Sequence, residues 1–150
     1  MKCVVPLIIV ALCSCLASGT ESAGTPSPRA QAIVDRVANE HADVARLSIH
    51  AAARRSGWRI VASTVKGRVG DPSDPEDERA AKSGEPVVLR EGRNLDYTLP
   101  VRDDSGRTIA IVGLTISGAA GGDEGALLAR AKALAEEIAA EIRALKPPLA

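Results

Sequence analysis

The spacing of apolar residues changes near residue 45, and this change constrains the fold more than any other feature of the sequence. Apolar residues recur every three or four positions over residues 33–38, behind the helix-start pair Ser27-Pro28. Over residues 45–51 they instead alternate with polar residues, which is typical of a strand with one buried face. We therefore expect a helix over residues 28–42, followed directly by a strand.

The rest of the chain repeats these two periods, with turns rich in Gly, Pro and Asp between the segments. The patterns predict strands over residues 58–65, 86–90, 95–102 and 108–117, a short acidic-capped helix over 74–84 and a final helix over 123–145. This order predicts an α+β domain, with a five-stranded antiparallel sheet and N- and C-terminal helices. Pro100 cannot donate a ladder hydrogen bond, so it implies a bulge or a strand end.

The N-terminal segment reads as an export signal. Lys2 is followed by an apolar run over residues 4–12, about half of what a bilayer span requires, and all three cysteines lie within the first fifteen residues. Residues 12–15 (Leu-Cys-Ser-Cys) resemble a bacterial lipobox, which predicts a signal peptide over 1–14 and a lipid on Cys15. Ordinary cleavage after residue 19 or 23 and an uncleaved anchor are the alternatives.

Residues 15–27 are small, polar and proline-containing, so we expect a flexible tether there, leading into a domain over residues 28–146. The expected location is extracytoplasmic: periplasmic, and anchored to a bacterial membrane through lipid only. The expected C-terminal helix carries a long apolar stripe, which we expect to cover the sheet. The alternative is that the stripe forms the seam of a homodimer.

Composition argues against nucleic-acid binding. The chain holds 19 basic and 19 acidic residues, and Trp58 and Tyr97 are its only aromatic residues. A nucleic-acid site needs excess positive charge and usually aromatic stacking platforms. We therefore expect no nucleic-acid partner.

Catalysis and metal binding are also not expected. His41 and His50 are the only imidazoles, and no serine sits in a glycine-flanked nucleophile turn. Both histidines are expected at surface or helix-end positions. The acidic run over residues 71–78 contains two prolines that break the spacing of a calcium loop, so helix capping explains it better. The sequence predicts no enzyme activity, no metal and no cofactor.

Several short phrases occur together and in order. They are Arg-Ile-Val-Ala-Ser-Thr at 59–64, Gly-Asp-Pro-Ser-Asp-Pro-Glu-Asp at 70–77, Ser-Gly-Glu-Pro-Val at 83–87, Leu-Pro-Val at 99–101 and Asp-Ser-Gly-Arg-Thr-Ile-Ala at 104–110. Together they resemble the single Cache domains, which are extracytoplasmic PAS-like sensor domains. The resemblance implies a small-molecule pocket between the sheet and the crossover from the second to the third strand, often for amino acids, amines or organic acids.

Within that resemblance, four side chains are candidates for ligand binding: Arg59, Ser63, Arg93 and Tyr97. For a carboxylate or amino-acid ligand, Arg93 would supply an ion pair and Tyr97 a hydrogen bond, with Arg59 as the alternative cation. The expected partner is such a small molecule, or a membrane signalling or transport protein. A protein-interaction module with a pocket filled by its own side chains is the rival interpretation.

Overall fold

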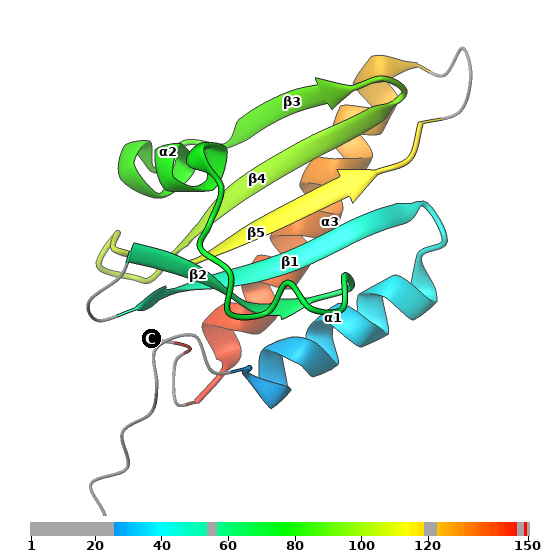
Figure 1. Cartoon of the computed structure of the whole chain (residues 1–150). Coiled ribbons are helices and arrows are strands. Elements are labelled where there is room, and N and C mark those ends of the chain that lie inside the picture. The colour runs from blue at the N-terminus through cyan, green and yellow to red at the C-terminus, as the bar shows by residue number, and fades with distance from the viewer. Residues whose placement is uncertain (1–25, 54–56, 119–122, 147–148, 150) are drawn as a thin grey trace, which may run out of the picture.

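The predicted element order is confirmed in a computed structural model that describes residues 26–53, 57–118, 123–146 and 149 (Figure 1). The elements are α1 (Pro28–Glu40), β1 (Val44–Ala53), β2 (Gly57–Ser63), α2 (Pro75–Ser83), β3 (Val87–Glu91), β4 (Asn94–Arg102), β5 (Thr108–Ile116) and α3 (Glu124–Ala144). The fold is α+β, as expected. The predicted signal peptide, Cys15 and all but the last two residues of the predicted tether lie outside the described residues.

The five strands form one antiparallel sheet in the order β2-β1-β5-β4-β3. The last strand of the chain, β5, therefore lies in the middle, between β1 and β4. Its sequence (Thr-Ile-Ala-Ile-Val-Gly-Leu-Thr-Ile) is nearly all apolar because both of its faces and both of its edges are covered.

The two faces of the sheet carry different covers. α1 and α3 pack on one face, α1 against β1 and β2 and α3 against β4 and β5. Leu47 and Ile49 of β1 and Ile138 of α3 belong to the one buried core on this face. α2 and residues 64–74 (the arm) cover the opposite face (Figure 1). Because side chains alternate along a strand, the polar residues between those apolar ones point toward α2 and the arm.

The arm is held to the outer edge of β2 by backbone hydrogen bonds. Gly70 N donates to Ile60 O at 2.8 Å, Ile60 N donates to Asp71 O at 3.1 Å, and Ser73 N donates to Trp58 O at 2.9 Å. These bonds pair an edge that would otherwise expose unpaired donors and acceptors. The arm is therefore an extension of the sheet.

Pro100 lies inside β4 rather than at its end. It pairs with Ile111 of β5, while β3 accompanies β4 only as far as Thr98. The missing N–H therefore does not interrupt the β3 ladder. The expected bulge occurs one residue later, as a register shift between Val101 and Arg102.

The C-terminal helix covers the sheet, as predicted from its apolar stripe. Its buried residues are Ala131, Leu134, Ala135, Ile138, Ala139 and Ile142, and they belong to the core on β4 and β5. Leu128 lies off this surface and is 37% exposed. The homodimer seam stays a prediction.

We expect Ile138→Ala to lower the free energy of unfolding by about 2–5 kcal/mol, because it leaves a cavity under the sheet. Leu128→Ala, on the same helix, is the matched control and should cost less than about 1 kcal/mol. Urea denaturation monitored by circular dichroism measures both. Equal losses from the two variants would contradict this packing.

Candidate functional site

A pocket of about 140 Å³ lies between the sheet and its α2-and-arm cover. Its floor comes from three central strands and β2, its roof from the arm and the first turn of α2, and its rim from the end of β3. The floor residues include Arg46, Ser48, His50, Ser63, Asp96, Thr98, Gly113 and Thr115, and the roof and rim supply Val65, Arg68, Asp74, Glu76, Asp77 and Glu91. The lining is therefore mostly polar.

Strand alternation explains this lining. Arg46, Ser48 and His50 of β1 point to the pocket, while Leu47 and Ile49 enter the core on the other face. The cross-strand partners follow the same rule, because residues paired in register point to the same face. Asp96, Thr98, Gly113 and Thr115 are joined to this set through the β1–β5 and β4–β5 registers.

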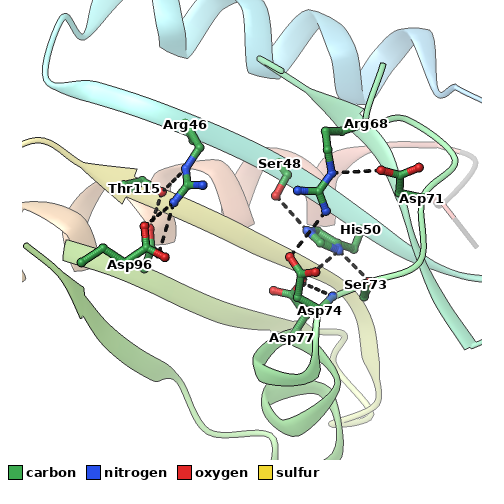
Figure 2. Close-up of polar contacts among 11 residues, drawn as sticks. Arg46, Ser48, His50, Arg68, Asp71, Ser73, Asp74, Asp77, Asp96 and Thr115 are labelled. Atoms are coloured by element: carbon green, nitrogen blue, oxygen red, sulfur yellow. Dashed lines mark hydrogen bonds and ion pairs between the residues drawn. The ribbon is translucent and has the colours of Figure 1, made fainter. Parts of the chain in front are cut away.

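His50 is at the centre of the site and is only 2% exposed. Its Nε2 lies 2.8 Å from Ser48 Oγ, and its Nδ1 lies 2.7 Å from Ser73 Oγ in the arm (Figure 2). Each hydroxyl can donate or accept, so both ring nitrogens are satisfied in either tautomer. Burial lowers the pKa of His50 to about 4, because the charged imidazolium loses its hydration.

Asp77, on the first turn of α2, faces the imidazole from the opposite side of the pocket. Its Oδ2 accepts a hydrogen bond from Asp74 N at 3.1 Å and lies 3.5 Å from His50 Nδ1. Its carboxyl therefore caps the helix, as the acidic run predicted, but it is also buried, with 4% exposure. Burial raises the pKa of Asp77 to about 6.

Two arginines lie on the pocket wall, at opposite ends (Figure 2). Arg68 holds the arm together, with its Nε 3.0 Å from Asp71 and its Nη2 3.5 Å from Asp74. Arg46 lies 2.7 Å from Glu91 and 3.5 Å from Asp96.

Thr115 connects Arg46 to Asp96 at one end of the pocket. It accepts a hydrogen bond from Arg46 Nε at 3.2 Å and donates one to Asp96. Both arginines are thus committed to carboxylates of the protein, so neither is a free anion-binding group.

Gly113 keeps the middle of the floor open. A Cβ atom added there would stand 2.9 Å from Ser48 Oγ, 3.6 Å from His50 Nε2 and 3.8 Å from Asp77 Oδ1. Its backbone needs no unusual dihedral angle, so the requirement for glycine is space. A small volume directly above Gly113 is therefore surrounded by three polar atoms.

The Ser48–His50 contact has the distance of a nucleophile and its general base, but its electrostatics do not suit that role. A general base works best when its pKa is near the working pH. A histidine with a pKa of about 4 is a weak base at neutral pH. The contact is better suited to presenting hydrogen-bonding groups to a ligand than to activating the serine.

Of the four residues predicted to bind a ligand, only Ser63 lines the pocket, where its Oγ accepts a hydrogen bond from Val65 N at 3.0 Å. Tyr97 is in the core on the other face, where burial and Glu136 of α3 raise its pKa. Arg93 is exposed in the β3–β4 turn, and Arg59 donates to Gly70 O in the arm at 2.8 Å. The structure therefore does not bring these four together, and their ligand-binding roles stay predictions.

The expectation of surface or helix-end positions was wrong for His50 and right for His41. His41 is the C-cap of α1 and lies 2.9 Å from Arg130. His50 is on the face that the sequence shows as polar, and that face is covered by the arm and α2. The alternation at residues 46–50 was the available signal, since it placed Ser48 and His50 side by side.

A metal site of the usual kind is not present in the part of the chain described here. No three His, Cys, Asp or Glu side chains are grouped there so as to hold an ion.

The pKa values of Asp77 and His50 shift in opposite directions, so the pH dependence of folding stability tests whether both groups are buried. Between pH 4 and 6 the folded state holds the Asp77 proton more tightly than the unfolded state, so this group makes stability fall as the pH rises. His50 binds its proton less tightly when folded, so it makes stability rise over about pH 4 to 6.5. Each effect amounts to about 3 kcal/mol, and the two nearly cancel in the native chain.

As the pH rises from 4 to 6, we therefore expect the free energy of unfolding of Asp77→Asn to increase by about 3 kcal/mol relative to that of the native chain. That of His50→Gln should decrease by about as much relative to the native chain. Urea denaturation at a series of pH values measures both differences. Asp104→Asn, in an exposed turn, is the control and should follow the native curve. Parallel curves for all four proteins would show that this pair is not buried.

No family model matches the sequence, and no curated protein is similar to it. Solved structures do share the fold. The GAF domain of A. aeolicus nlh2 in an inactive state aligns over 77% of this chain and 82% of its own, at 11% identity and a TM-score of 0.59. The GAF domain region of a Geobacter sulfurreducens protein aligns over 77% of this chain and 91% of its own, at 12% identity and a TM-score of 0.55.

A transcriptional regulator of Alicyclobacillus acidocaldarius aligns over 77% of this chain and 66% of its own, at 13% identity and a TM-score of 0.53. At these identities the likeness concerns the fold alone. The fold is GAF-like and related to PAS-like sensor folds, and the likeness is not to Cache domains specifically. The short sequence phrases that resemble Cache domains therefore identified the broad fold and not this particular class.

Proposed function

We propose that this chain is a non-catalytic, sensor-like domain that binds a small molecule between its sheet and its α2-and-arm cover. The observation that carries the proposal is the polar pocket of about 140 Å³, built from side chains of both layers around His50 and Asp77. Small-molecule sites are concave and contain a few polar groups that converge from different elements. The polar, open floor at Gly113 argues against the rival module with a filled pocket.

The GAF-like fold supports the same proposal. Neighbours of this fold include two GAF domains and a transcriptional regulator. The weak basicity of His50 agrees with a role in binding. A membrane signalling or transport partner, as expected from the sequence, remains a proposal. The carboxylate or amino-acid ligand expected from the sequence is less well supported, because both pocket arginines are paired with carboxylates of the protein.

A thermal-shift screen of the purified full chain against metabolites tests ligand binding. A ligand at 100 times its dissociation constant adds about 2.7 kcal/mol of stability, which raises the melting temperature by several degrees. Gly113→Val should abolish the shift, because its side chain would occupy the floor beside Ser48.

Ala45→Val, at an exposed position of β1, is the control and should keep the shift. Circular dichroism of the free variants checks that each is folded. A ligand that shifts the native chain and folded Gly113→Val equally would place binding elsewhere.

We also propose that the domain is extracytoplasmic and anchored by a lipid on Cys15. The support is the lipobox-like segment at residues 12–15 and its apolar run. In the described ranges, no helix has both the length and the apolar character needed to cross a membrane.

Replacing Cys15 with Ser should release the protein from the membrane fraction, because the lipid would have no attachment atom. Cys13→Ser, two residues away, is the control and should remain in the membrane fraction. Fractionation followed by immunoblotting measures both. Retention of Cys15→Ser in the membrane, or a soluble native protein, would contradict anchoring through this residue.

A further inference from the structure

The pocket is strongly acidic although the chain as a whole is balanced. The chain carries equal numbers of acidic and basic residues. The pocket is lined by five carboxylates and two guanidinium groups, namely Asp74, Glu76, Asp77, Glu91 and Asp96 against Arg46 and Arg68. His50 adds no positive charge near neutral pH because its pKa is about 4. A pocket with this excess attracts cations and repels anions.

The existing ion pairs leave this excess in one part of the pocket. Arg46 and Arg68 neutralise carboxylates at the two ends. Glu76 and Asp77, on the first turn of α2, have no lysine or arginine within ion-pair distance among the described residues. Among the described residues, the basic group within ion-pair distance of Asp77 is His50, at 3.5 Å, and the positive charge of Arg68 acts on this carboxyl only from farther away. The unneutralised charge therefore lies on the roof, above the centre of the floor.

Unused hydrogen-bonding atoms converge on the same place. Asp77 Oδ2 is engaged by Asp74 N, but Oδ1 makes no hydrogen bond within the described part of the chain and is directed toward Gly113. Thr98, next to Gly113 in the β4–β5 register, is 5% exposed, and its hydroxyl has no hydrogen-bond partner among the described residues. No fully enclosed side-chain oxygen in the described residues lacks a partner, so both atoms are accessible, and both residues line the pocket.

We propose that the pocket binds a small organic ammonium ion, with its N–H groups directed at Asp77 Oδ1 and the floor hydroxyls of Ser48 and Thr98. The inference rests on the proposed function and specifies its ligand class. An ammonium group carries up to three donors and no acceptor, which matches one carboxylate oxygen and two hydroxyl oxygens. Gly113 supplies the space that the ligand needs.

The same chemistry explains why a free anion is disfavoured. An incoming carboxylate would have to displace Glu91 or Asp96 from Arg46, or Asp71 or Asp74 from Arg68. It would also approach the buried carboxyl of Asp77, and like charges repel most strongly where water is excluded. The carboxylate expected from the sequence is therefore the less favourable ligand for this pocket.

Isothermal titration calorimetry of the full chain with matched probes tests the proposal. The cationic probes are ethanolamine and 1,4-diaminobutane, the anionic probes of similar length are glycolate and succinate, and magnesium chloride tests for a simple metal site. We expect the amines to bind, and the anions and magnesium not to bind. Tighter binding of either anion, binding of magnesium in place of the amines, or no binding by the amines would overturn the cation assignment.

Variants locate the binding. Asp77→Asn should weaken amine binding about 10- to 100-fold, since it removes the buried negative charge. Glu78→Gln, an exposed acidic residue of the same helix, is the matched control and should bind like the native chain. Unchanged binding by Asp77→Asn would overturn the assignment.

Since Asp77 also caps α2, a second variant guards against loss of folding. Thr98→Val removes a hydroxyl that has no hydrogen-bond partner in the described part of the chain, so it should fold normally and weaken amine binding about 3- to 10-fold. Full amine affinity in Thr98→Val would remove this group from the site.

Two failures can be told apart. A metabolite anion that binds the native chain and is lost in Gly113→Val would leave the pocket as the ligand site and reject only the charge assignment. The absence of any ligand in both the screen and the calorimetry would reject the proposed function as well.

Discussion

The burial of polar side chains on one face of the sheet is the constraint on which the rest of this structure depends. A sheet face that carries Arg46, Ser48 and His50 would ordinarily be left to water. Here α2 and the arm close over His50 and partly over Ser48, while Arg46 stays half exposed, and buried polar groups must then find hydrogen-bond partners. His50 finds one on its own strand and one in the arm, at Ser73, so the histidine joins the two layers.

This arrangement also keeps the two layers apart at one point. Apolar side chains on both layers would have packed together and left no space, as they do under α1 and α3. Polar groups that are fixed by their own hydrogen bonds cannot collapse in this way, and Gly113 removes the side chain that would have filled the centre. The pocket is thus a consequence of the polar alternation of β1 and of one glycine in β5.

Most of the fold could be predicted from the sequence, because the alternation in β1, the continuous apolar run of β5 and the helix signals at Ser27 and Asp123 are local features. Much less of the candidate site could be predicted in this way. The same alternation, applied to residues 95–101, groups Tyr97 with Leu95, Leu99 and Val101 in the core and leaves Asp96 and Thr98 for the pocket. The prediction of the four ligand-binding residues did not use that pattern. The burial of His50 and Asp77 depends on how the arm returns across the sheet, which is a tertiary property that no local spacing contains.

The protonation of His50 tests the central claim most directly, because burial beneath the arm controls it. Nuclear magnetic resonance of the imidazole, with the His50→Gln variant to assign the signals, follows the ring through a pH titration. The account predicts that the His50 ring stays neutral down to about pH 4, since the cover denies water to its charged form. Titration near the ordinary value of 6.5 would show that the face is open to solvent, and would contradict both the covered pocket and the ligand site built on it.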